Sequence, residues 1–267
     1  MRNASLNERF SLTKFIFFFF MNTSDYRRFG GISRLFGQKG FEKLQKSHVT
    51  VVGVGGVGSW AAEALVRTAV GSITIIDGDR VAESNCNRQL PAMDGCFGLK
   101  KVDVLRERFL RINPALNVRA IGEFVCESNF DQLLDSTDLV LDCIDSLSAK
   151  AALIDYLRQK NIPVFTSGGA GGKMDPSRIA CADLAQAHGD PLLGALRSRL
   201  RKEYGFPKGI GKKPEPFGVM AVYSSEAVLP SQDGAEGFGV FMPVTASFGM
   251  VLAKNAILSL LSTEEKS

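Results

Sequence analysis

A glycine-rich turn between a strand and a helix is the feature that most constrains how this chain folds. The β-rich residues 48–52 lead directly into Gly53-Val54-Gly55-Gly56-Val57-Gly58, and residues 59–68 follow with the apolar spacing of a helix. Glycines spaced as G-x-G-x-x-G allow a tight turn and bring backbone N–H groups close to phosphate oxygens at a helix N-terminus. The motif predicts a nucleotide site, and the alternative is a glycine turn that only packs helix on strand.

Strand and helix patterns continue to alternate after this turn. Further buried strands are predicted at residues 73–77, 118–124, 138–142 and 163–166, and helices at 100–112 and 147–160. Two later strands, at residues 178–183 and 218–223, extend the sheet. The alternation predicts an α/β fold, with a Rossmann-like, mostly parallel sheet, helices on both faces and an extension by C-terminal strands. Ligands of such sheets bind beyond the carboxyl ends of the strands.

The two ends of the chain differ in character from its middle. Residues 15–20 are strongly apolar but far shorter than the ~20 residues of a spanning helix, and no small-residue cleavage site follows them. We expect residues 1–20 to be a non-native or disordered N-terminal extension with Met21 as the natural start, and residues 21–267 to form one domain. That domain carries a basic insert near residues 196–216 and an apolar helix near 245–262.

Composition limits the classes of function. Hydrophobic residues make up 45% and charged residues 22%, as in a globular protein. The net charge of +4 gives no case for polyanion binding by the molecule as a whole, so a nucleic-acid surface would have to be local. Five cysteines without CxxC spacing and two histidines argue against a structural zinc site. This cysteine usage favours a reducing, cytoplasmic location. Most cysteines, Cys143 and Cys181 included, are expected to be small core residues, which disfavours thioester chemistry.

The residues that follow the later strands narrow the choice of nucleotide. Asp77 ends one strand and can bind ribose hydroxyls, as it would also in an NAD enzyme. Arg88 offers a planar fork of donors for phosphate, Lys101 supplies a point charge, and Asp145 can hold Mg²⁺. These groups favour an enzyme that expels pyrophosphate, because negative charge grows on that leaving group. The predicted ATP-site residues are Gly53, Gly55, Gly56, Gly58, Asp77, Asp79, Asn85, Arg88, Gln89, Lys101 and Asp145.

At these positions the chain resembles the ubiquitin-activating-enzyme-like superfamily, which includes the adenylyltransferases of thiamine and molybdopterin synthesis. The resemblance implies that Asp77 contacts the ribose of ATP and that Asn85, Arg88 and Lys101 contact its phosphates. It also implies that Asp145 binds the Mg²⁺ that accompanies ATP. In homodimers of this superfamily an arginine of the N-terminal segment reaches the partner's ATP. Arg34 is the candidate for that catalytic role here, with Arg28 as the alternative.

Several further stretches resemble one branch of this superfamily, the tRNA threonylcarbamoyladenosine dehydratases. They are residues 28–31, 34–37, 57–65, 166–172, 175–176, 183–185 and 190–192. The branch implies ATP-dependent adenylation of the threonyl carboxylate of N6-threonylcarbamoyladenosine at position 37 of tRNA, followed by intramolecular ring closure. It also implies a homodimer and leaves room for a sulfur-transfer partner such as a cysteine desulfurase.

The basic stretch and the apolar C-terminus suggest partners of their own. Arg199, Arg201 and Lys202 could follow an RNA backbone, with Tyr204 or Phe206 as stacking faces, whereas the alternative is a solvated helix and loop. The apolar segment from residue 240 to 261 is about long enough to span a bilayer. Its proline, hydroxyl side chains and lysine instead favour a helix packed on the core or at a dimer interface, with peripheral membrane contact as the alternative.

Two other functions fit the same residues. One is adenylation of the C-terminus of a ubiquitin-like sulfur-carrier protein, which would need a groove for a flexible tail. The other is an NAD-type Rossmann oxidoreductase or a non-catalytic nucleotide-binding module. Release of pyrophosphate from ATP, without a change in NAD(P)H absorbance, separates adenylation from this second class.

Overall fold

The computed structural model describes residues 23–209, 214–234 and 237–262. The chain divides into two compact units, residues 1–43 and residues 44–267. Helix α2 (Thr23–Lys46) is kinked at Gly37, whose φ of 73° is a conformation that favours glycine. Within the first unit, the Gln38 side chain donates to Glu42 Oε1 at 2.9 Å, one helical turn further on. The expected extension of residues 1–20 lies outside the described residues.

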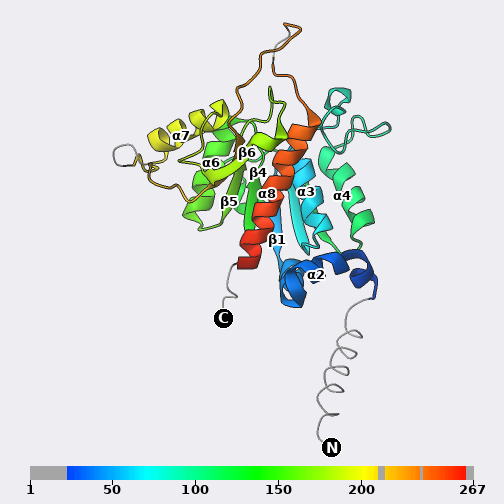
Figure 1. Cartoon of the computed structure of the whole chain (residues 1–267). Helices are drawn as coiled ribbons and strands as arrows, with labels where there is room; N and C mark the ends of the chain where they lie inside the picture. Colours follow the sequence, from blue (N-terminus) through cyan, green and yellow to red (C-terminus); the bar gives the residue numbers. More distant parts are fainter. Residues whose placement is uncertain (1–22, 210–213, 235–236, 263–267) are drawn as a thin grey trace, which may run out of the picture. The chain divides into compact units, whose positions relative to one another are not determined.

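The second unit is built on a seven-stranded sheet with the order β3-β2-β1-β4-β5-β7-β6, in which only β6 is antiparallel to its neighbour (Figure 1). Short connections alternate with helices, so the parallel strands end at one common edge. The strands are β1 (His48–Val52), β2 (Ser72–Ile76), β3 (Asn117–Ile121), β4 (Leu139–Asp142), β5 (Val164–Ser167), β6 (Ile179–Asp183) and β7 (Met220–Ser224). The helices are α3 (Gly58–Arg67), α4 (Lys101–Ile112), α5 (Phe130–Leu133), α6 (Leu147–Gln159), α7 (Pro191–Glu203) and α8 (Met242–Ser262), with 3-10 turns η1 (Glu83–Asn85) and η2 (Pro176–Arg178).

Helices cover both faces of this sheet. Helices α3, α4 and α8 lie together on one face, and α6 and α7 pack against each other and a shared apolar core on the other (Figure 1). The central strands β1, β2 and β4 are buried almost throughout, because both of their faces are covered. The predicted α/β class, the parallel sheet and its extension by C-terminal strands are therefore confirmed.

Helix α8 packs on α3 at a close helix–helix contact. A Cβ atom at Gly249 would lie 2.5 Å from the carbonyl oxygen of Val57 and 2.9 Å from the backbone nitrogen of Ala61. Only glycine allows this approach without a backbone shift. Helix α8 is long and apolar enough to cross a membrane, but 56% of its most apolar window is buried inside the fold. The apolar surface of α8 thus packs on helix α3 and on the sheet.

The expectation that most cysteines are core residues is wrong. Cys86, Cys126 and Cys181 are exposed, and Cys96 and Cys143 are half-buried. Cys181 lies on the edge strand β6, where its Sγ accepts a hydrogen bond from Asn255 Nδ2 of α8 at 3.1 Å. An alternating pattern identifies a strand but does not show how far other elements cover it. Strand β6 is the last strand of the sheet, and Cys181 is exposed there.

Candidate nucleotide site

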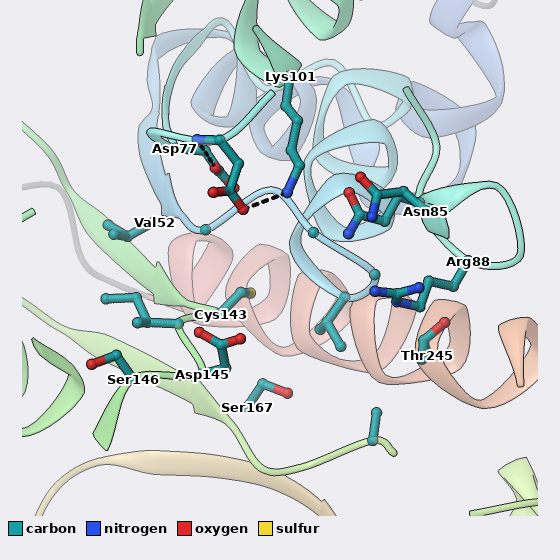
Figure 2. Close-up of a pocket in the computed structure, with 18 of the residues that line it drawn as sticks. Val52, Asp77, Asn85, Arg88, Lys101, Cys143, Asp145, Ser146, Ser167 and Thr245 are labelled. Atoms are coloured by element: carbon teal, nitrogen blue, oxygen red, sulfur yellow. Dashed lines mark hydrogen bonds and ion pairs between the residues drawn. The ribbon is translucent and has the colours of Figure 1, made fainter. Parts of the chain in front are cut away.

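A pocket of about 780 Å³ lies at the carboxyl ends of β1, β2, β4 and β5, which is the size and the place expected for a nucleotide. Figure 2 shows Lys101, Asn85 and Arg88 along one wall, with Asp145 and Ser167 on the other side of the opening. The predicted residues that line it are Gly53, Gly55, Gly56, Asp77, Asp79, Asn85, Arg88, Gln89, Lys101 and Asp145.

The glycine turn forms one end of the pocket. Gly53 has a φ of +83°, and a Cβ there would lie 2.8 Å from the carbonyl oxygen of Cys143. Gly58 does not line the pocket; a Cβ at this position would lie 1.8 Å from the carbonyl oxygen of Gly53. Gly53, Gly55 and Gly56 therefore line the cavity, while Gly58 packs behind the turn. Helix α3 begins at Gly58, directly after the pocket residue Val57, so its N-terminus lies at this end of the pocket.

Asp77 holds its carboxylate in one orientation at the pocket floor. Its Oδ2 accepts a hydrogen bond from the backbone N–H of Val54 at 2.8 Å, and its Oδ1 accepts one from Asp79 at 2.8 Å. Each oxygen keeps a further lone pair for a ligand. Because the side chain is only 9% exposed, a ribose hydroxyl that fits beside it would bind an acceptor that is already fixed in place.

Two cations enter the pocket from the next segments of the chain. Lys101 begins α4 and its Nζ lies 2.7 Å from Oδ2 of Asp79; the lysine side chain is buried, whereas that of Asp79 is 55% exposed. The Arg88 guanidinium donates to the carbonyl oxygen of Ser84 at 2.8 Å and to Asn87 Oδ1 at 2.9 Å. The backbone of Arg88 is fixed by the Trp60 indole, which donates to its carbonyl oxygen at 2.9 Å. Arg88 therefore has donors left for an anion.

Gln89 carries an unsatisfied polar atom beside these cations. Its Oε1 is buried and has no hydrogen-bond partner among the described residues, although its side chain lines the pocket. An orphaned buried acceptor costs about 1–3 kcal/mol, so such an atom is normally satisfied by water or ligand. The oxygen and nitrogen of the amide are exchangeable by a flip, so a bound ligand can present either a donor or an acceptor to this side chain.

Asp145 extends into the opening from the turn after β4, and a fully buried ion pair supports that turn. Lys150 Nζ lies 2.8 Å from Asp142 Oδ2 and 3.0 Å from Thr166 Oγ1, and both ionic side chains are 0% exposed. The other Asp142 oxygen accepts a hydrogen bond from the backbone N–H of Ile144 at 3.1 Å. The network thus joins β4, β5 and α6 directly beneath Asp145, which stays exposed.

The pocket has few features of a metal centre, but it fits a magnesium ion that arrives with a nucleotide. The described residues contain no group of three or more histidine, cysteine or acidic side chains placed to hold a metal. Mg²⁺ commonly uses one or two carboxylates together with phosphate oxygens and water. Asp145, which lies at the opening in Figure 2, supplies the carboxylate of that donor set.

Sequence reasoning missed several residues of this pocket. Arg80 adds a cation to the rim, and its guanidinium donates to the carbonyl oxygen of Gly98 at 2.7 Å. Phe124 lies against Gly78, and Thr245 of α8 lies next to Gly56. Arg80 belongs to the same polar stretch as Asp77 and could have been found there. Phe124 and Thr245 come from segments distant in sequence, so no local signal marked them.

The two arginines considered for the partner's ATP, Arg34 and Arg28, belong to the first unit, and their role stays a prediction.

Cys143 lines the pocket without the properties of a nucleophile. Burial raises the pKa of its thiol to about 12, and this effect outweighs the charge of Lys150, which acts in the opposite direction. The thiolate is the reactive form of cysteine, so almost none is present at neutral pH. The expectation that this residue carries no thioester stays a prediction.

The basic helix α7 uses much of its charge within the fold. Arg199 pairs with Glu203 at 2.8 Å and donates to Ser148 Oγ at 2.6 Å, and Arg201 lies over the Phe217 ring at 5.2 Å. Lys202 is exposed. The suggestion that Phe206 offers a stacking face to RNA is wrong. Phe206 is 3% exposed, because Phe217 and the Arg158 guanidinium pack against its ring.

Together the parallel sheet, the glycine turn, the fixed aspartate and the converging cations define a Rossmann-like nucleotide-binding protein. Residues 29–267 match the ThiF family, and the chain belongs to that family.

Named relatives cover nearly the whole chain. It is 42% identical over 255 residues to the tRNA threonylcarbamoyladenosine dehydratase of Escherichia coli, covering 88% of this chain and 94% of the relative. It is 41% identical over 247 residues to the Haemophilus influenzae protein of the same name, with the same coverage. A crystal structure of the Escherichia coli dehydratase in complex with ATP superposes with a TM-score of 0.83 at 43% identity, covering 89% of this chain and 95% of that one.

Proposed function

We propose that this chain is an ATP-dependent tRNA threonylcarbamoyladenosine dehydratase. The observation that carries the proposal is the convergence of Asp77, Arg88, Lys101 and Asp145 on one pocket beside the glycine turn. The shared architecture and identity with dehydratases over nearly the full chain supply the substrate class. Neither alternative, a sulfur-carrier adenylyltransferase or an NAD oxidoreductase, is favoured by these relatives.

The proposed reaction overcomes the poor reactivity of a carboxylate. An oxygen of the threonyl carboxylate attacks the α-phosphorus of ATP, and pyrophosphate leaves. The resulting acyl adenylate is a good electrophile, so a nucleophilic atom of the neighbouring carbamoyl group can displace AMP and close a ring. The net change is the loss of one water from the modified adenosine, at the cost of one ATP.

Each residue of the pocket has a proposed part in this reaction. The glycine turn and the N-terminus of α3 bind phosphate oxygens, and Asp77 binds the ribose. Arg88 and Lys101 bind the phosphates and stabilise the charge that develops on pyrophosphate. Asp145 holds Mg²⁺, which neutralises phosphate charge when it is bound. Asp79 now holds Lys101, and we propose that phosphate replaces this partner when ATP binds.

The proposal extends to the assembly and its surroundings. A homodimer in the cytoplasm is proposed, in which Arg34, or alternatively Arg28, reaches the ATP of the partner. The exposed Lys202 on α7 is the proposed phosphate contact for tRNA, since the neighbouring arginines are held within the fold.

One assay separates these functions. The purified chain is incubated with ATP and Mg²⁺, and AMP and pyrophosphate are measured with tRNA that carries N6-threonylcarbamoyladenosine. Matched samples contain the same tRNA without the modification, or a sulfur-carrier protein. We expect release with the modified tRNA only, and mass spectrometry of its nucleosides should show the loss of one water. Release with the carrier protein alone would contradict the proposal.

A further inference from the structure

The connection between β7 and α8, residues 225–241, is fastened to the glycine stretch that lines the pocket. The backbone N–H of Gly172 donates to the carbonyl oxygen of Gly239 at 2.8 Å, and the backbone N–H of Leu229 donates to the carbonyl oxygen of Gly172 at 2.8 Å. The described parts of this connection contain no helix or strand, and Figure 1 shows it projecting from the fold at the end where α8 begins. Long connections of this kind commonly serve binding or catalysis.

Two phenylalanines of this connection are exposed at the edge of the pocket. Phe238 is 64% exposed and Phe241 is 48% exposed. Val240, between them, lines the pocket, and a Cβ at the pocket residue Gly171 would lie 3.0 Å from the Cβ of Phe238. We refer to Phe238, Val240 and Phe241 as the aromatic rim. Exposed aromatic side chains next to a reaction pocket indicate a surface that a ligand covers.

The aromatic rim lies on the phosphate side of the pocket. The carbonyl oxygen of Phe241 accepts the backbone N–H of Thr245 at 3.2 Å, which fixes the rim to the first turn of α8. Thr245 packs next to Gly56 and lies near Arg88 (Figure 2). The ribose ligand Asp77 belongs to the other side of the site. The rim is therefore placed beside the substrate that meets the phosphates of ATP rather than beside the nucleoside of ATP.

We propose that Phe238 and Phe241 stack on unpaired bases of the tRNA anticodon loop and thereby hold the threonyl carboxylate at the pocket. This inference rests on the proposed function. Proteins recognise single-stranded RNA loops by stacking splayed bases on aromatic rings, and such stacking contributes about 1–3 kcal/mol per base. The alternative occupant, a second copy of this chain, is an outcome of the test below.

The test measures the affinity of the full chain for tRNA that carries N6-threonylcarbamoyladenosine, by fluorescence titration with labelled tRNA at fixed salt. Phe238→Ala and Phe241→Ala should each raise the Kd about five- to hundredfold, which corresponds to the loss of one stacked base. Phe238→Leu should be as weak as the alanine variant, because it keeps apolar surface but loses the flat ring. Phe238→Trp should keep the affinity. Leu229→Ala, at a 41% exposed position of the same connection that does not line the pocket, is the matched control and should have no effect.

Two further measurements decide what a negative or mixed result means. The Kd for ATP should be unchanged in every variant, since Phe238 and Phe241 do not line the nucleotide pocket. Sedimentation should show the same oligomeric state as in the unmodified chain. Unchanged tRNA affinity in both alanine variants would overturn the inference, and so would a loss of dimer in them. If the unmodified chain releases neither AMP nor pyrophosphate with modified tRNA, the proposed function itself fails.

Discussion

A single substitution of Lys101 can test how much its charge contributes to the reaction. Its Nζ has an exposed carboxylate partner, Asp79, so Lys101→Met leaves no buried charge without a partner. We expect kcat/KM for ATP to fall about 10²–10³-fold, as when one preorganised donor to a developing negative charge is removed. Lys100→Met is the control, because Lys100 is exposed and does not line the pocket. Equal losses in the two variants, measured by pyrophosphate release, would contradict this role for Lys101.

The buried pair of Lys150 and Asp142 predicts a different effect, on stability. Lys150→Met leaves the Asp142 carboxylate buried without its counter-charge, which costs about 3–5 kcal/mol in the free energy of unfolding. The double variant Lys150→Met with Asp142→Asn removes both charges and should recover much of that loss. Urea unfolding at pH 7 measures both. A double variant no more stable than the single one would show that the charges are not coupled.

Residue by residue, the sequence predicted which side chains line the pocket, because these side chains follow strand ends. Asp77 and Asp145 lie directly after predicted strands, and parallel strands bring such positions to one edge. Burial was predicted less well. Cys181 and Phe206 were misjudged because burial depends on which element packs on a strand or loop, and no local pattern states that. The orphaned acceptor of Gln89 likewise depends on its surroundings in space.

At the scale of elements, the contact between α3 and α8 links stability to the glycine turn. Gly249 of α8 lies against the backbone of Val57 and Ala61, at the start of α3. Gly249→Ala places a Cβ 2.5 Å from a carbonyl oxygen, so the two helices must separate. We expect a loss of about 1–3 kcal/mol in stability, with weaker ATP binding because the phosphate-facing turn moves with α3.

The matched control for this contact is Gly194→Ala in helix α7. Its nearest neighbour is the end of the Arg197 side chain, 3.9 Å from the position of the new Cβ. Alanine there should stabilise the protein by up to about 1 kcal/mol through helix propensity alone. Thermal unfolding and ATP titration of both variants show whether Gly249→Ala lowers stability and ATP affinity while Gly194→Ala raises stability. The apolar run predicted a packed C-terminal helix, but periodicity could not identify the one glycine at which the helices meet.

At the scale of the whole molecule, acid stability depends on how α3 and α4 are joined. Glu63 of α3 is 4% exposed. Its Oε2 accepts a hydrogen bond from Nε of Arg108 of α4 at 2.9 Å, and its Oε1 accepts one from Nε of Arg67 at 2.8 Å. Burial alone would raise the pKa of Glu63. The hydrogen bonds and charges of the two arginines act in the opposite direction and outweigh burial, so its pKa lies below the ordinary value of 4.5.

A lowered carboxyl pKa fixes the sign of the pH dependence. The folded state releases the Glu63 proton more readily than the unfolded chain, so the stabilisation is present above the ordinary pKa and is lost as the pH falls through the folded one. Glu63→Gln should therefore lower stability by about 1–3 kcal/mol at pH 7, with a difference that shrinks below about pH 4. Glu107→Gln, which removes an exposed pair with Arg111, should change stability by less than about 0.5 kcal/mol at either pH. Urea unfolding across this pH range tests the coupling, and a Glu63→Gln curve parallel to that of the unmodified chain would contradict it.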